Sequence, residues 1–411
     1  MNIPEQYLKA TSAFFDSLFE ERMRRHQTSD VLPVRTFVDP RIARKHDAEY
    51  NSRIIEEAIQ ANDGYGVTFP RELKLPKGNI PICRPIRGDG RKVILQGYSG
   101  IGFGSRLWCD SVHWEFDTSH HIKTEHFPQG TTPVVEIGYE KKRLGPNPDE
   151  GFQCGVSNVA IVCPLKPQRP VSGIMWESGL QECSTVRYVS VSNYSGYGIG
   201  GPTRQHHEHN DPTPANHLPQ VNTVVFEKIW IHSPNVKFPN AIGMNVHGLN
   251  FDIRNLTVHH WNGRQAVFRQ PCIILSSRTC GRLSQAHLEH NPPRGIDSAA
   301  PCVLIPDDRT ASRLSIDGAY CYLAANLFSD SKSETVRIEN PAASVTLQNI
   351  SHRTGTVGDL NKTTVCVNDV PRRKESGAQF SRGSGKVLAF YSRQRDQRGV
   401  YSVVTTDPAL E

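Results

Sequence analysis

The sequence predicts an all-β chain folded as a parallel β-helix, a solenoid in which each turn of the coil stacks on the next. Short segments rich in Val, Ile and Leu alternate with polar residues over most of the chain. Pairs of apolar residues recur along these segments about 25 to 40 residues apart, often near 28, as in a stacked array. Glycine (32) and proline (28) are plentiful, which favours many turns over long elements.

Two helices are expected before the strands. Residues 5–25 form a predicted amphipathic helix whose large apolar side chains gather on one side: Tyr7, Leu8, Phe14, Phe15, Leu18 and Phe19. Packing against the domain behind it is favoured over a role in oligomerisation or docking. Residues 51–62 are the second predicted helix, with Ile54, Ile55, Ala58 and Ile59 at helical spacing. The stretch "YGVTFP" follows it as a short predicted strand.

The repeat is clearest in the middle of the chain, where paired apolar residues are expected to point into the coil. These pairs are Val189/Val191, Ile229/Ile231, Leu256/Val258, Ala286/Leu288 and Leu314/Ile316. Cys154 and Cys183 lie about one repeat apart, as do Cys272 and Cys302, so a ladder of buried thiols is expected. The irregular spacing and scarce hairpin signals argue against a propeller, and the leucine-rich repeat pattern is absent.

The stretch "RIIEEAIQANDGYGVTFP", followed by "KLPKGNIPI" and "RKVILQGYSG", resembles the entry to the pectate-lyase-like superfamily of right-handed parallel β-helices. A later segment, "VSGIMWESGLQECSTVRYVSVSNYSGYGIG", is similar to its recurring rung. The resemblance covers about residues 35 to 350, and it implies a helix that caps the open end of the coil. It does not fix the function, because the superfamily holds lyases, hydrolases, epimerases and non-catalytic phage appendages. The acidic motifs of its galacturonase and calcium-dependent pectate lyase branches are not found.

Composition narrows the class of protein. The net charge of +6 is modest for 411 residues and does not indicate a nucleic-acid partner. No apolar stretch is long enough to cross a bilayer, and the N-terminus does not read as a secretion signal. We therefore expect a chain that is cytoplasmic as synthesised, or associated with a virion or released. The ten cysteines are expected to be mostly reduced and buried.

Candidate catalytic residues lie on two neighbouring repeats. In "SQAHLEHN", the inward positions of Ala286 and Leu288 leave His287 and Glu289 pointing outward as an acid/base pair. One repeat earlier, "FDIRNLTVHHWNG" offers Asp252 as an acid and Arg254 as a substrate clamp. His259 and Trp261 follow there, and Trp261 is suited to stacking on a sugar ring. The alternative for the first segment is a solvated outer strand with polar alternation, and the alternative for the second is a surface ion pair and an ordinary packed Trp.

Further candidates are weaker. Asp307 and Asp308 could bind substrate or a cation, although Pro306 favours a turn, and Glu177 beside Trp176 could contact a sugar. The histidine-rich loop 206–217 holds metal-capable residues without the fixed spacing of a metal site, so a solvated loop is favoured there. No metal ligand is assigned, and Ca²⁺ is the expected cofactor only if the protein is a lyase.

Three regions are expected: a helical extension over 1–34, the β-helix over 35–360, and a C-terminal capping segment over 361–411 with strands in "KVLAFYS" and "GVYSVVTT". The leading functional hypothesis is a polysaccharide lyase or glycoside hydrolase that holds its polysaccharide in a groove along the coil. The alternative is a non-catalytic, tail-spike-like virion appendage. No membrane partner is expected, and a homotrimer is the expected assembly if the chain oligomerises.

Overall fold

The structure is a computed structural model, and most of the β-helix is described by it. The described residues are 31–61, 71–88, 93–98, 104–109, 114, 121–138, 154–176, 179–180, 183–202, 220–262, 268–290, 300–307, 312–323, 336–340, 343–354, 365–367, 370–372, 386–393 and 401–404. The predicted helix 5–25 and the stretch "YGVTFP" lie outside these ranges. None of the described helices is long and apolar enough to span a membrane.

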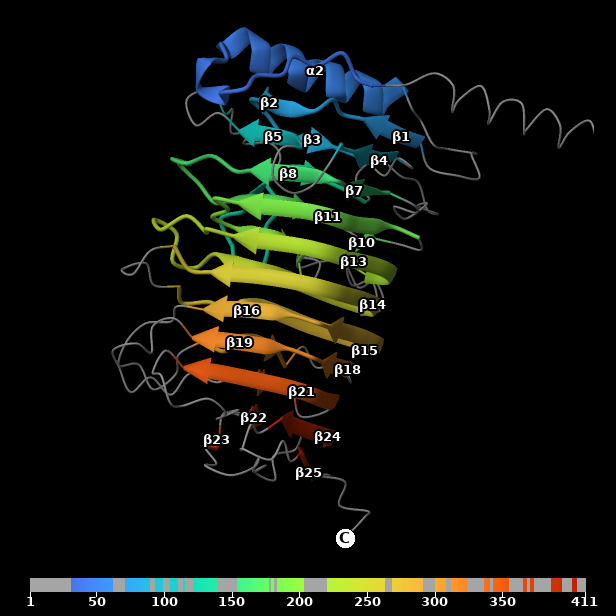
Figure 1. Ribbon diagram of the computed structural model, residues 1–411, viewed down its shortest axis with the longest axis vertical. Helices are drawn as coiled ribbons and strands as arrows, with labels where there is room; N and C mark the ends of the chain where they lie inside the picture. Colours follow the sequence, from blue (N-terminus) through green and yellow to red (C-terminus); the bar gives the residue numbers. More distant parts are fainter. Residues whose placement is uncertain are drawn as a thin grey trace, which may run out of the picture.

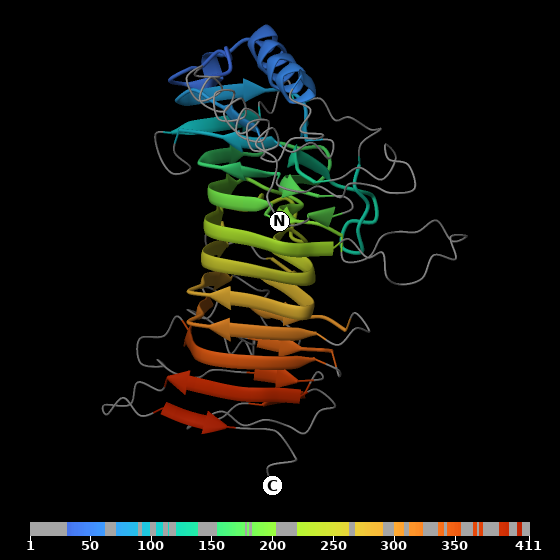
Figure 2. The same cartoon turned by 90° about the vertical axis from the view of Figure 1, so that its right-hand side faces the viewer.

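The chain descends from an N-terminal helix as a right-handed coil of short strands (Figures 1 and 2). A 3₁₀ turn, η1 (Pro40–Ile42), and the helix α2 (Lys45–Ala61) come first. The strands of the first half are β1 (Arg71–Lys74), β2 (Gly78–Ile82), β3 (Ile86–Arg87), β4 (Val93–Gln96), β5 (Ser105–Cys109), β6 (Thr132–Glu136), β7 (Gly155–Ser157), β8 (Val159–Val162), β9 (Val171–Met175), β10 (Gly179–Leu180), β11 (Thr185–Ser192) and β12 (Tyr197–Gly200). Those of the second half are β13 (Gln220–His232), β14 (Ile242–His260), β15 (Ile273–Ser284), β16 (His287–His290), β17 (Val303–Ile305), β18 (Arg313–Asp317), β19 (Tyr320–Leu323), β20 (Val336–Ile338), β21 (Ser344–Thr354), β22 (Val365–Val367), β23 (Val370–Arg372), β24 (Lys386–Arg393) and β25 (Tyr401–Val404).

Most strands pair in parallel with a strand one turn further along the chain, which makes three columns of strands. One column runs through β2, β5, β8 and the final parts of β11, β13 and β14 to β16 and β19. A second runs through β1, β4, β7, β11 and the middle of β13 and β14 to β15, β18 and β21. The third contains β3, β6, β9 and β12. This pairing confirms the predicted parallel β-helix.

The core fills the inside of the coil with the residues that alternation predicts. All five predicted apolar pairs, from Val189/Val191 to Leu314/Ile316, are buried. Cys272, Cys302 and Cys321 are also buried and form no disulfide, which agrees with an interior stack of thiols. Cys154 is buried but Cys183 is exposed, so this predicted pair is wrong. Cys183 sits in a turn with φ of 62°, where the chain leaves the regular strand positions.

In five turns of the coil, from β7 to β16, the corner between the first two columns is made by one residue in the left-handed conformation. Asn158, Tyr188, Lys228, Asn255 and Gln285 all have φ between 53° and 57° at this corner. Asn tolerates this conformation better than most residues, whereas a β-branched residue is strained in it. The corner fixes which residues belong to each outer face.

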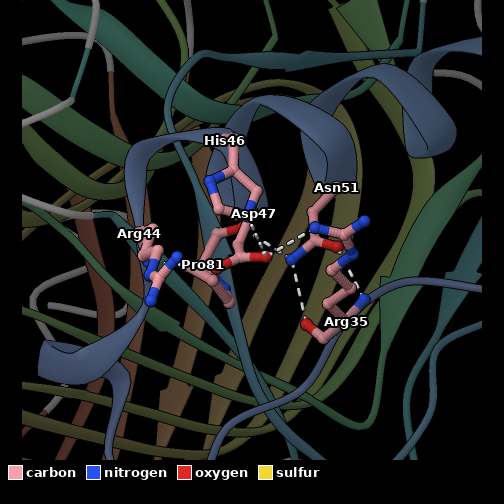
Figure 3. Close-up of polar contacts among 6 residues, drawn as sticks. All are labelled: Arg35, Arg44, His46, Asp47, Asn51 and Pro81. Atoms are coloured by element: carbon pink, nitrogen blue, oxygen red, sulfur yellow. Dashed lines mark hydrogen bonds and ion pairs between the residues drawn. The ribbon is translucent and has the colours of Figure 1, made fainter.

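The helix α2 covers the first turns of the coil and lies at one end of the stack (Figure 2). Asn51 is buried there, and its side-chain oxygen accepts a hydrogen bond from the backbone N–H of Arg35 at 2.7 Å. Its side-chain nitrogen donates hydrogen bonds to the backbone carbonyl oxygens of Arg35 and Pro81, each at 2.9 Å (Figure 3). Arg35 also forms an ion pair with the buried Asp47 at 2.7 Å. These contacts tie the helix to the chain before it and to the first turn, as a cap requires.

The helix begins at Lys45, earlier than the predicted start near residue 51. The side chain of Asp47 accepts a hydrogen bond from the backbone N–H of Arg44 at 3.0 Å, which satisfies a donor at the start of the helix. At the other end, β24 pairs in parallel with β21 and in antiparallel with β25, so both predicted C-terminal strands exist and form a hairpin.

We predict that Asn51→Leu lowers the free energy of unfolding by about 2 to 4 kcal/mol, because it leaves buried backbone groups without partners. Arg53→Lys, on the exposed side of the same helix, should change it by less than about 0.5 kcal/mol. Urea unfolding followed by circular dichroism measures both. Equal effects of the two substitutions would show that Asn51 does not hold the cap.

We predict that Asn255→Val lowers the free energy of unfolding by about 1 to 3 kcal/mol, because a β-branched residue is strained at φ of 53°. Asn255→Gly is the matched control, since glycine adopts this conformation without strain, and it should stay close to the parent chain. The same urea titration tests the pair. A valine variant as stable as the glycine variant contradicts the role assigned to this corner.

Candidate functional site

The outward positions of β14 and β16 carry the candidate site. Ala286 and Leu288 point into the coil and are buried, so the residues between and after them, His287 and Glu289, face outward, as predicted. Glu289 lies beside His259 in the parallel register of β16 and β14. Neighbouring parallel strands are about 4.8 Å apart, so side chains at paired positions can touch.

The carboxylate of Glu289 is the centre of this cluster. Its Oε1 atom lies 2.9 Å from Nε2 of His287 and 3.8 Å from Nε2 of His259. Its Oε2 atom accepts a hydrogen bond from the indole N–H of Trp261. The side chains of Glu289, His259 and His287 are 17%, 29% and 42% exposed, so the carboxylate is largely shielded while the imidazoles reach solvent. We name Glu289, His259, His287 and Trp261 together the Glu289 cluster.

The electrostatics of the cluster favour a charged Glu289 carboxylate beside a neutral His259 ring. Burial raises the pKa of Glu289, but the hydrogen bonds from His287 and Trp261 outweigh it, and the pKa lies below its ordinary value. Burial lowers the pKa of His259, and the neighbouring Glu289 only partly opposes this. One turn earlier, burial together with His259 and Arg106 lowers the pKa of His232 to about 4.

Aromatic side chains extend the same face over neighbouring turns. Trp230 stacks on His232 with ring centres 4.2 Å apart, and it meets the edge of His259 at 6.0 Å. On the other side, His287 packs against Tyr320 at 5.0 Å. Candidate selection from the sequence missed Trp230, His232 and Tyr320. Their signal was the alternation in "KIWIH", where the buried Ile229 and Ile231 leave Trp230 and His232 outward.

The structure divides the four predicted catalytic residues into two pairs. His287 and Glu289 join the Glu289 cluster, together with the predicted binding residues His259 and Trp261. Asp252 and Arg254 instead bind each other, with Arg254 Nε 2.7 Å from the Asp252 carboxylate.

Asp252 and Arg254 precede the corner at Asn255, so they lie in the second column of strands, whereas the Glu289 cluster lies in the first. Arg254 pairs in register with Glu227, whose carboxylate lies 3.7 Å from Arg187, so this face carries a row of alternating charges. Among the described residues, no hydrogen bond or ion pair joins this row of charges to the Glu289 cluster.

The remaining predicted site residues are placed only in part. Asp307 is exposed after β17. Asp308, Glu177 and the histidine-rich loop 206–217 lie outside the described residues.

A second group of metal-capable side chains lies inside the coil, directly behind the cluster. His260, Cys272 and His290 are fully buried, and the rings of His260 and His290 stack with centres 5.2 Å apart and planes 8° apart. Nε2 of His260 lies 2.8 Å from the carbonyl oxygen of Ala241. Neither ring nitrogen of His290 makes a hydrogen bond of normal geometry. Burial lowers the pKa of His290, and Cys302 and the nearby backbone groups oppose this shift only in part.

Comparison with known proteins gives no match to a protein-family model and none to a curated protein. Solved structures do match. ORF18 of Geobacillus virus E2 is 12% identical with a TM-score of 0.40, and the alignment covers 90% of this chain and 75% of that one. The A-module of the mannuronan C-5 epimerase AlgE4 from Azotobacter vinelandii is 14% identical with a TM-score of 0.33, covering 79% and 97%. A tailspike protein of E. coli bacteriophage HK620 is 9% identical with a TM-score of 0.32, covering 77% and 61%. Similarity at this level identifies neither a substrate nor a reaction.

We predict that His260→Leu lowers the free energy of unfolding by about 1 to 3 kcal/mol, because it leaves the Ala241 carbonyl without this partner. His290→Leu is the matched control, since this ring has no normal hydrogen bond to lose, and it should cost less than about 1 kcal/mol. Thermal and urea unfolding of the two variants measure the difference. Equal losses would contradict the interpretation of His260 as the ring that is held by a hydrogen bond.

Proposed function

We propose that this chain binds an acidic polysaccharide on the outer face around the Glu289 cluster and cleaves it by elimination. The observation that carries the proposal is the convergence of two imidazoles and an indole N–H on one shielded carboxylate, on a face lined with aromatic rings. Imidazole and carboxylate groups are the usual proton donors and acceptors in enzymes.

The shape of the face supports an extended polymer. Outward side chains repeat at each turn of the coil, about 4.8 Å apart, so Trp230, His259, Glu289 and Tyr320 follow one another along its length. Aromatic rings offer flat apolar surfaces that suit the apolar face of a sugar. The net charge of +6 is modest, but it is compatible with weak attraction to an anionic chain.

Elimination is favoured over hydrolysis by the acids at the site. Glycoside hydrolysis commonly uses two carboxyl groups that face each other across the scissile bond. Among the described residues of the cluster, Glu289 is the single carboxylate. Elimination from a uronate needs instead a base near the proton beside the sugar carboxylate, and a positive group that stabilises the charge developing there. Either outward imidazole can serve as that base.

A non-catalytic binding role is the second candidate, and one observation favours it. Both oxygens of Glu289 already have partners, Oε1 in His287 and Oε2 in Trp261, as in a side-chain network that holds a binding surface rigid. The predicted virion or tail appendage, with a homotrimeric assembly, fits this role. Light scattering of the purified chain tests the trimer.

We predict that the full chain releases unsaturated, ultraviolet-absorbing products from a uronate polysaccharide such as alginate or polygalacturonate. Glu289→Gln and His287→Ala should each lower the rate by about 100-fold or more, because each removes a group of the acid–base cluster. His46→Gln, on the exposed side of α2, is the control and should keep the parent rate.

The products separate the hypotheses. New reducing ends without ultraviolet absorbance would show hydrolysis and overturn elimination. Retardation of the chain by the polysaccharide in affinity gels, without any product, would support the non-catalytic role. Neither product nor retardation over a panel of acidic polysaccharides would contradict both.

A further inference from the structure

We propose that His259, His287 and Glu289 form a binding site for a divalent transition-metal ion of the zinc type. The inference deepens the proposed function, because it names a cofactor for the same face, and in that role it rests on that function. Metal binding itself can be measured without any substrate. The sequence alone assigned no metal ligand.

The three ligand atoms converge from two neighbouring turns of the coil. Nε2 of His287 and Nε2 of His259 lie 2.9 and 3.8 Å from the same oxygen of Glu289, and the group spans no more than 4.8 Å. Ligands of a tetrahedral zinc ion, each at about 2.0 to 2.2 Å, are about 3.3 to 3.5 Å apart. The observed separations bracket this value, so a small rotation of the imidazoles closes the set around one ion.

The backbone under the ligands is well fixed. Val258 and Leu288 are fully buried beside His259 and Glu289, and they sit opposite each other in the parallel register. The indole N–H of Trp261 holds the second oxygen of Glu289, which is the kind of outer contact that orients a metal-binding carboxylate. The ligand set is therefore positioned before any ion arrives.

The donor set selects the class of ion. Two imidazoles and one carboxylate are ligands of catalytic zinc sites, which keep a position open for water or substrate. Ca²⁺ prefers six to eight oxygen ligands, so the Ca²⁺ expected for a lyase does not suit these three residues. The exposed side of His287 leaves room for the open position.

The buried group behind the cluster is a poorer candidate for the same ion. The rings of His260 and His290 are parallel within 8°, so their in-plane lone pairs run side by side and do not meet at a point. The rings of His259 and His287 are inclined by 66°, which allows convergence. The outer group is also open to solvent, whereas the inner one is enclosed.

An ion at this site would supply what the Glu289 cluster lacks for elimination. None of the four residues of the Glu289 cluster is Arg or Lys. A metal ion can stabilise the negative charge that grows on a uronate carboxylate. With His259, His287 and Glu289 all acting as ligands, neither imidazole would be free to serve as the base, and water at the open position of the ion, whose pKa the ion lowers, would take that role. Substitution of Glu289 would then remove the ion together with the activity.

Calorimetric titration of the tag-free, chelator-treated full chain with ZnCl₂ tests the proposal. The parent chain should bind one zinc ion that is lost, or bound at least about tenfold more weakly, in Glu289→Gln and in His259→Ala. His232→Gln, one turn earlier on the same face, is the matched control and should retain the affinity. CoCl₂ in place of zinc should give visible absorption bands of a low-coordinate site in the parent chain and in His232→Gln, but not in Glu289→Gln or His259→Ala. Circular dichroism verifies that each variant is folded.

Two results would overturn the metal site. One is zinc binding that survives Glu289→Gln unchanged, which would place the ion elsewhere, such as the histidine-rich loop 206–217. The other is no binding by the folded parent chain. Unsaturated product from the metal-free chain would reject the role of the ion in elimination and keep the proposed function, whereas zinc binding without any product would keep the metal site and reject elimination.

Discussion

The parallel pairing between strands of successive turns is the interaction on which the rest of the structure depends. It sets the 4.8 Å spacing of the turns, and together with burial of alternate residues it decides which side chains face outward. A slip of one residue in β16 would bring Leu288 to the surface and Glu289 into the core. The large apolar interior excludes that slip, because Ala286 and Leu288 fit only on the inside. The Glu289 cluster is thus a consequence of the register.

A coil of this kind has two open ends, and each needs closure. The helix α2 covers the first turn and is fastened through Asn51, whose side chain satisfies backbone groups of two different segments. The antiparallel hairpin of β24 and β25 follows the last parallel pairing at the other end. In the middle turns, one left-handed residue per turn bends the chain at the corner, and so separates the charged row at Arg254 from the Glu289 cluster.

The fold could be predicted from the sequence because alternation and repeat length are local signals. The same signals placed His287 and Glu289 outward. The structure does not group Asp252 and Arg254 with His287 and Glu289, because a corner of the coil lies between the two pairs. Apolar residues step by two along a strand, but the step from Ile253 to Leu256 is three, and the extra residue is the corner at Asn255. The partners of Glu289 could not be found from one strand alone, since they come from register between turns.

The central claim is that the face around Glu289 is where this protein meets its polysaccharide. A crystal structure of the chain with a bound acidic oligosaccharide tests it most directly. The account predicts sugar rings lying along the coil against Trp230 and Trp261, with a sugar carboxylate within reach of His259, His287 and Glu289. An oligosaccharide bound on the Asp252–Arg254 face, away from the Glu289 cluster, would contradict it.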